Sequence, residues 1–191
     1  MQAHNPKSTG SMTTKTLSYC ALLAALSVVL ARLIVPMPNA STRFSIEAVP
    51  IFIAGMLFGP VAGGLVGFSA DFVGCLFSGF GYNPLFSLPP ILYGVFAGVF
   101  RNFLSKNVSI PRLILAFLPP IVGGSLLWQS ATLAFVYGDD GFGASFIYFL
   151  STRSIQFAIT MALDVIIIYF LFRSGIFNRL GVWSPKQKKK N

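Results

Sequence analysis

The sequence is poor in charged residues. Only 10% of its 191 residues are Asp, Glu, Lys or Arg, whereas 54% are hydrophobic. Soluble domains carry about 25% charged residues, so this shortage excludes an ordinary water-soluble fold. It indicates an integral membrane protein.

Histidine, cysteine and nucleotide-binding sequences are also scarce or missing. The one histidine, His4, lies in a polar N-terminal stretch, and the two cysteines, Cys20 and Cys75, are far apart within apolar runs. This composition excludes histidine-based acid–base catalysis and a zinc framework, and it favours two buried thiols over a disulfide. No G-x-x-x-x-G-K-[ST] sequence is present. We therefore expect no metal, no cofactor and no direct use of ATP.

Apolar runs instead dominate the chain. A hydrocarbon core of about 30 Å needs roughly 20 helical residues per crossing. Six runs approach this length, at residues 15–35, 44–59, 61–79, 85–104, 112–136 and 145–173. The predicted fold is an all-α membrane bundle of six transmembrane helices in one domain, residues 12–180. It is preceded by a polar extension or tag, residues 1–11, and followed by a basic tail, residues 181–191.

The basic residues are distributed unevenly over these six runs. If both termini are cytoplasmic, 11 of the 14 basic residues lie on the cytoplasmic side. They are Lys7, Lys15, Arg101, Lys106, Arg112, Arg173, Arg179, Lys186, Lys188, Lys189 and Lys190. This positive-inside bias predicts an even number of crossings and assigns the lysine tail to topology at the lipid bilayer, with no nucleic-acid partner.

The third run carries a carboxylate, Asp71, in the stretch "GLVGFSADFVG". Gly63, Gly67 and Asp71 recur at four-residue intervals, so they share one helical face. Small residues on such a face let helices approach closely, which places Asp71 against protein and not against lipid. Asp71 is then either a helix–helix hydrogen-bond partner or a ligand contact, because charges inside membranes are costly.

A polar stripe follows the sixth run. Arg153, Gln156, Thr160 and Asp164 recur at intervals of three and four residues on an otherwise apolar helix. An ion pair between Arg153 and Asp71 would make the stripe purely structural. With Trp128 in the outer half of the bundle, the same residues fit a small-molecule pocket, which combines aromatic walls with a few oriented polar groups.

Two outer loops add aromatic residues. The loops "PMPNASTRFSIEAVP" and "SGFGYNPLFSLPP" hold turn residues together with Phe44, Tyr82 and Phe86, so they are predicted to close over the bundle as lids. An interfacial aromatic belt is the alternative. The predicted substrate-binding residues are Arg32, Phe44, Asp71, Tyr82, Asn83, Phe86, Tyr93, Trp128, Arg153 and Gln156.

The chain also resembles a known family. The segments "LSYCALLAALSVVLARL" and "RFSIEAVPIFIAGMLFGPVAGGLVGFSADFVGCLF" are similar to the substrate-binding S components of energy-coupling factor (ECF) vitamin transporters. The resemblance covers residues 12 to about 180. It is closest to the folate-specific members, on "LARL", "FGPVAGGLVGFSADF" and "GYNP".

The resemblance implies a high-affinity receptor for folate or a related pterin. Such receptors work with an ECF transmembrane coupling subunit and two ATPases in a bacterial cytoplasmic membrane, and they catalyse no reaction. It implies that Arg32 lies against the pterin ring, which suits a planar guanidinium. By chemistry alone, Asp71 is the expected acceptor for the pterin N–H groups.

The resemblance also implies a role for the pair Ala21 and Ala25. Their A-x-x-x-A spacing allows close helix crossing, and in the family such a pair on the first helix docks the coupling subunit. Packing inside the bundle is the alternative for this pair.

Three other functions remain open at this point. The same fold can bind another flat ligand, such as riboflavin or a queuosine precursor. The buried carboxylates leave an intramembrane enzyme as a weaker hypothesis. A non-catalytic assembly subunit would bind no small molecule at all.

Overall fold

A computed structural model describes residues 13–32, 35–36, 43–44, 46–77, 82–138 and 141–183, without the side chains of 35–36 and 43–44. The predicted extension, residues 1–11, and residues 184–191 of the predicted tail lie outside the described residues. The same holds for residues 37–42 and 45 of the first outer loop, for residues 78–81 of the second, and for the side chain of Phe44.

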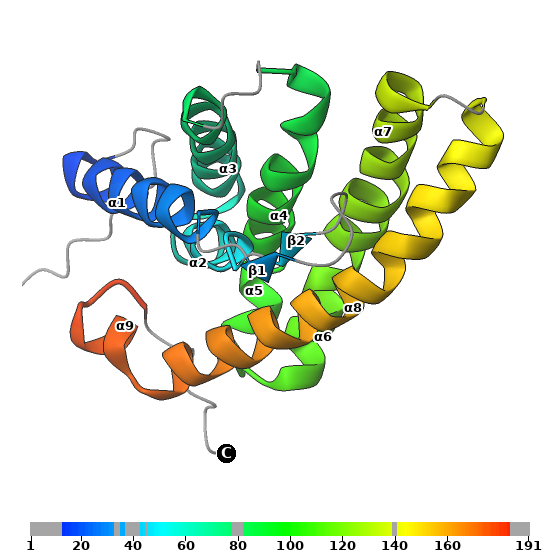
Figure 1. Ribbon diagram of the computed structural model, residues 1–191. Helices are drawn as coiled ribbons and strands as arrows, with labels where there is room; N and C mark the ends of the chain where they lie inside the picture. Colours follow the sequence, from blue (N-terminus) through cyan, green and yellow to red (C-terminus); the bar gives the residue numbers. More distant parts are fainter. Residues whose placement is uncertain are drawn as a thin grey trace, which may run out of the picture.

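The described chain is almost entirely helical (Figure 1). The helices are α1 (Thr14–Leu30), α2 (Ala48–Phe58), α3 (Pro60–Leu76), α4 (Leu88–Val99), α5 (Arg101–Leu104), α6 (Ile110–Pro119), α7 (Gln129–Tyr137), α8 (Phe142–Arg173) and α9 (Ile176–Arg179). A 3₁₀ turn, η1 (Pro84–Phe86), precedes α4, and a π-helical segment, η2 (Pro120–Trp128), joins α6 to α7. Two short strands, β1 (Val35–Pro36) and β2 (Arg43–Phe44), pair antiparallel.

Each predicted span coincides with a helical segment, but the ends of the first two were wrong. The first helix stops at Leu30, not at 35, and the second begins at Ala48, not at 44. Val35 precedes Pro36, and a residue before proline is pushed out of the helical conformation towards an extended one. Val35 accordingly pairs with Phe44 in the ladder, which is also the one departure from an all-α fold among the described residues.

Two of the described helices are long and apolar enough to cross a membrane. These are the continuous helix Ile110–Tyr137, which contains α6, η2 and α7, and α8. Shorter apolar helices cover Thr14–Leu30, Ala48–Phe58, Pro60–Leu76 and Pro84–Val99. The pair Pro119-Pro120 does not end the first long helix but marks the start of its π-helical part. Proline lacks an N–H donor, so the ladder of hydrogen bonds must shift there.

Glycines allow α2, α3 and α4 to touch through their backbones. A Cβ added to Gly63 would overlap the carbonyl oxygen of Gly94, and one added to Gly94 would overlap that of Gly63. Gly55 of α2 and Gly67 of α3 lie equally close to the α4 backbone. The predicted small-residue face of α3 is therefore confirmed for Gly63 and Gly67, while a Cβ on Gly74 would meet nothing within 4 Å. We call the contact of Gly55, Gly63, Gly67 and Gly94 the glycine seam.

Helix α2 occupies the centre of the bundle. Ten of its 11 residues are buried, and it packs against α1, α3, α4, α5 and α8 (Figure 1). Helix α1 lies at the edge: only Cys20 and Ser27 are buried, and Ser27 Oγ donates to the Glu47 carbonyl oxygen before α2 at 2.7 Å. Both cysteines are free thiols, Cys20 buried as predicted and Cys75 only partly.

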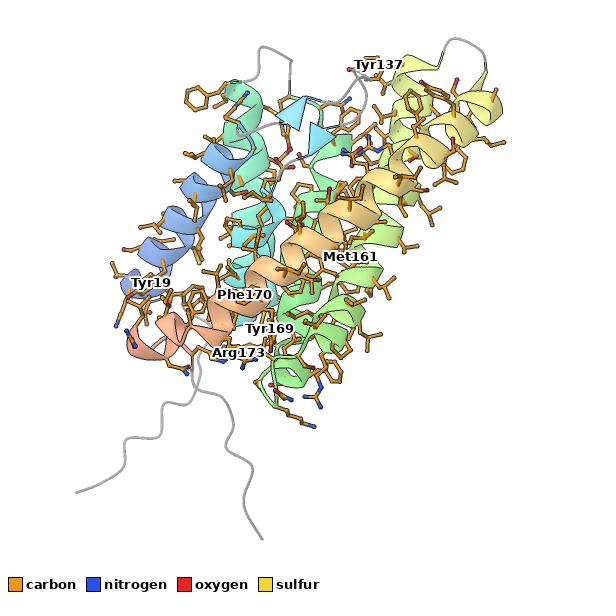
Figure 2. The ribbon with its side chains drawn as sticks, turned by 60° about the horizontal axis from the view of Figure 1, so that its bottom comes forward. Tyr19, Tyr137, Met161, Tyr169, Phe170 and Arg173 are labelled. Atoms are coloured by element: carbon orange, nitrogen blue, oxygen red, sulfur yellow. The ribbon has the colours of Figure 1, made fainter. Side chains whose placement is uncertain are left out.

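The two ends of the bundle differ in the connections they carry. Figure 1 shows the connections α3–α4 and α7–α8 at the top, and α5, the start of α6 and α9 at the bottom. In Figure 2, Tyr19, Tyr169 and Arg173 lie together at one end, and Tyr137 lies at the other. The Arg173 side chain donates to the Tyr169 hydroxyl at 2.6 Å.

Candidate functional site

Asp71 is tied to the segment before α4. Its Oδ2 accepts a hydrogen bond from Ser87 Oγ at 2.5 Å, and the hydroxyl oxygens of Ser87 and Tyr82 are 3.0 Å apart. The Tyr82 ring meets Phe72 of α3 edge-on at 5.2 Å. Asp71 therefore does make the predicted helix-to-helix hydrogen bond. Its partner is a serine that the sequence analysis did not single out.

Arg32 joins this group from the end of α1. Its side chain is exposed, and its Nη2 donates to the Gly74 carbonyl oxygen of α3 at 2.6 Å. Both Arg32 and Asp71 act electrostatically on the Cys75 thiol. We call Arg32, Asp71, Tyr82 and Ser87 the outer cluster, because they gather where α1 and α3 end and α4 begins.

The short helix η1 is capped by one hydrogen bond and attached to η2 by another. Asn83 caps it, since Asn83 Oδ1 accepts from the Leu85 N–H at 3.1 Å. The indole N–H of Trp128, at the end of η2, donates to the Leu85 carbonyl oxygen at 2.8 Å. Phe86 of η1 is half-buried. Three predicted site residues thus lie in or against η1, and two of them hold its backbone.

A second group of polar residues lies inside the bundle. Helix α8 buries Arg153 and Gln156, each with 7% of its surface exposed, and Asp164 with 2%. The spacing in the sequence placed these residues on one face, and their common burial confirms it. The Arg153 guanidinium also lies 5.1 Å from the centre of the Phe157 ring.

Polar residues of α4 and η2 lie near this stripe. The buried Tyr93 hydroxyl of α4 is 3.0 Å from Ser125 Oγ of η2. Tyr93 interacts electrostatically with Glu47, Arg153 and Asp164, and Glu47 also interacts with Asp164. The interior polar cluster consists of Tyr93, Ser125, Arg153, Gln156, Thr160 and Asp164. Glu47, whose side chain is exposed, acts on this cluster electrostatically.

Helices α4 and α8 both contribute to the interior polar cluster, but they are separated by the helices that pack on both of them. Both helices pack on α2, α6 and η2. Among the described helices, however, α4 and α8 do not pack extensively on each other. Polar side chains from both therefore meet within the bundle without a close helix–helix contact between them.

The structure divides the predicted site residues between the two clusters. Arg32, Asp71, Tyr82, Asn83, Phe86 and Trp128 lie in or beside the outer cluster, whereas Tyr93, Arg153 and Gln156 belong to the interior one. Asp71 bonds to Ser87 and not to Arg153. Sequence analysis missed Glu47, Ser87 and Ser125. Glu47 could have been recognised from the sequence, because it is an acidic residue directly before an apolar helix. A single serine has no comparable feature.

Apolar helices that enclose several charged and polar side chains are typical of a membrane-embedded binding protein. A sequence profile described as "ECF-type riboflavin transporter, S component" matches residues 11–176. The chain belongs to this family, the S components of ECF-type transporters. The family consists of transporter components that bind substrates.

Individual relatives point to the folate-specific members of the family. The folate transporter FolT of Clostridium novyi (strain NT) is 29% identical over 152 residues, which are 79% of this chain and 84% of the relative. A crystal structure of FolT bound with folic acid has a TM-score of 0.71 at 30% identity, over 84% of this chain and 93% of that one. The resemblance predicted from the sequence is thus confirmed.

The fold itself extends to other members. The S component for biotin from an ECF-type ABC transporter has a TM-score of 0.62, and the superposition covers 91% of this chain and 100% of that one. At 21% identity, this likeness shows the shared fold alone.

Proposed function

We propose that the chain is the folate-binding S component of an ATP-driven ECF vitamin transporter. The observation that carries the proposal is the similarity to FolT bound with folic acid, at 30% identity over 93% of that chain. The buried polar side chains of α4, η2 and α8 suit a flat heterocycle with hydrogen-bonding edges, because they combine tyrosine, amide, carboxylate and guanidinium groups.

Riboflavin is the second candidate ligand. The family profile that matches residues 11–176 carries riboflavin in its description. Riboflavin and folate are both flat, but their polar edges differ: the pterin edge offers adjacent N–H donors, whereas the flavin edge places one N–H between two carbonyl oxygens. The buried carboxylate of Asp164 favours the donor-rich pterin, because an N–H group can donate to it.

The deciding experiment identifies the ligand directly. The protein is purified in detergent, and small molecules released on denaturation are identified by mass spectrometry. Folic acid and riboflavin are then titrated separately into ligand-free protein by calorimetry. We expect saturable binding of folic acid and none of riboflavin; the reverse result would assign the chain to riboflavin, and binding of neither would favour an assembly role.

The proposed membrane arrangement has six crossings with both termini in the cytoplasm. The two long helices and the four shorter apolar helices supply six helical segments. Four of the described basic residues, Arg101, Arg112, Arg173 and Arg179, belong to α5, α6, α8 and α9. The bottom end of the bundle in Figure 1 holds α5, the start of α6 and α9. This distribution supports a cytoplasmic position for that end. The outer cluster then faces the outside.

The proposed partners are an ECF transmembrane coupling subunit and two ATPases, because the chain has no ATP-binding sequence of its own. Ala21 and Ala25 are the proposed docking pair. Both are exposed on α1, next to the exposed Leu22 and Leu26, so packing inside the bundle does not occupy them. Small residues on an exposed membrane helix allow close approach of another helix.

The proposed ligand position lies between the two clusters. The heterocycle is placed with one face towards Arg32 and its polar edge towards the interior polar cluster. Tyr82, Asn83, Phe86 and Trp128 lie at the mouth, together with Phe44 of the first outer loop. The hydrogen bond from Arg32 to Gly74 supports the stacking role, because it orients the guanidinium plane without using its faces.

A further inference from the structure

One carboxylate in the interior polar cluster lacks a hydrogen-bond donor. Asp164 has 2% of its surface exposed, and its Oδ1 finds no partner among the described residues. The Oγ1 of Thr160, one helical turn before it, is also buried and without a partner there. Buried polar atoms are nearly always hydrogen-bonded, because an unsatisfied atom has lost its water without gaining another partner.

The neighbouring side chains do not supply the missing donor. The Tyr93 hydroxyl is already 3.0 Å from Ser125 Oγ. The charged group that acts on Asp164 is the carboxylate of Glu47, which accepts and does not donate. A group that brings N–H donors would satisfy Asp164 Oδ1 and Thr160 Oγ1 together.

Asp71 differs from Asp164 because it has a hydrogen-bond donor and is less buried. Its Oδ2 already accepts a hydrogen bond from Ser87, and its side chain is only half-buried. A carboxylate that is satisfied by protein discriminates weakly between ligands, whereas a buried and unsatisfied one discriminates strongly, because the wrong ligand leaves it unpaired.

We propose that Asp164, supported by Thr160, accepts hydrogen bonds from the aminopyrimidine edge of the pterin and thereby selects folate over riboflavin. This inference rests on the proposed folate function. The pterin presents its 2-amino and N3–H groups side by side, and a carboxylate accepts both at once. The flavin edge would instead offer one N–H flanked by two carbonyl oxygens, so the second carboxylate oxygen of Asp164 would face an acceptor, which is unfavourable. Asp164 thus takes the acceptor role that sequence analysis assigned to Asp71.

The test uses two ligands and one matched pair of variants. Folic acid and a folate analogue without the 2-amino group are titrated by calorimetry into the purified full-length protein. We expect the parent to prefer folic acid by about 100-fold, because the analogue lacks one hydrogen bond to the buried carboxylate. Asp164→Asn should lower this preference to near one, whereas Asp71→Asn should retain it whatever its affinity. Thr160→Val should reduce it partly.

The outcomes separate the inference from the function. Binding of folic acid with an unchanged preference in Asp164→Asn overturns the inference and leaves the folate function intact. Loss of the preference in Asp71→Asn overturns it in favour of Asp71, and equal affinity of the parent for both ligands overturns it as well. No binding of folic acid by the parent overturns both proposals. If Asp164→Asn does not yield a folded protein, the other two variants provide the test. An unchanged preference in Thr160→Val, or a lost preference in Asp71→Asn, then overturns the inference.

Discussion

Helices α1 and α2 are both apolar, but α2 is buried in the bundle whereas most of α1 is not. Ten of the 11 residues of α2 are buried, and its helix contacts five others. Of the 17 residues of α1, only Cys20 and Ser27 are buried. Hydrophobicity therefore predicts which segments lie in the membrane. The position of small residues along a helix determines which of these segments pack at the centre of the bundle.

The comparison assigns the two helices different tasks. The glycine seam lets α2, α3 and α4 approach until their backbones touch, so α2 provides the framework. The alanines of α1 stay exposed, so no described part of this chain covers their surface. Breaking the seam should destroy the fold, whereas blocking α1 should destroy only coupling.

The largest effect is expected from adding a methyl group to the seam. In Gly94→Ala the new Cβ would overlap the backbone of Gly63, and overpacking of this kind costs about 1–3 kcal/mol or more. Thermal unfolding in detergent should show a clear loss of stability and of folded yield. Gly74→Ala is the control, since its Cβ meets nothing within 4 Å. Equal melting temperatures for the two variants would contradict the framework role of α2 to α4.

The second effect separates transport from binding. Replacing Ala25 by Trp should reduce folate uptake to background in cells that supply the partner subunits, because the bulky ring blocks close helix approach. Folate binding by the isolated variant should be nearly unchanged, since Ala25 is exposed. Ile155→Trp changes another exposed position, on α8, and should leave both measurements intact. A joint collapse of binding and stability in Ala25→Trp would show internal packing instead.

A smaller effect tests the outer cluster. Arg32→Ala should weaken folate binding about tenfold, which corresponds to a guanidinium stacked on an aromatic ring. Arg32→Lys should lose most of the same affinity, because an ammonium keeps the charge but lacks the plane. Calorimetry on both variants makes the comparison. If the lysine variant binds like the parent, Arg32 acts through its charge, for example on the carboxylates of folate.

The smallest effect concerns the attachment of η1. Trp128→Phe keeps an aromatic ring but removes the N–H that donates to the Leu85 carbonyl oxygen at 2.8 Å. Losing one such hydrogen bond costs about 1 kcal/mol, so folate affinity should fall about fivefold at most. Trp183→Phe, near the C-terminal end of the described chain and packed on Phe172, is the control and should leave affinity unchanged. A loss of 100-fold in Trp128→Phe would instead mean direct contact with the ligand.

Sequence patterns located the helices and the faces that pack. Apolar runs placed all six helical segments, and the four-residue spacing of Gly63 and Gly67 identified the face of α3 that packs on α4. The spacing of Arg153, Gln156 and Asp164 identified the buried face of α8. These features repeat with the period of a helix, so they can be recognised without a structure.

Pairwise contacts between distant residues were not predictable in the same way. The bond between Asp71 and Ser87 and the contact between Tyr93 and Ser125 join residues 16 and 32 positions apart. A single serine hydroxyl leaves no periodic signal, because its role depends on which helix lies opposite. The short ladder of β1 and β2 was missed for a similar reason, since the apolar runs continue to its edges.

The glycine seam also limits how the protein can move. Where two backbones touch, there is no side chain whose rotamer can change to let one helix slide on the other. Helices α2, α3 and α4 are therefore expected to behave as a rigid body. The opening through which a ligand enters must then be made by shifting the opposite wall, formed by η2, α7 and α8, against a fixed block.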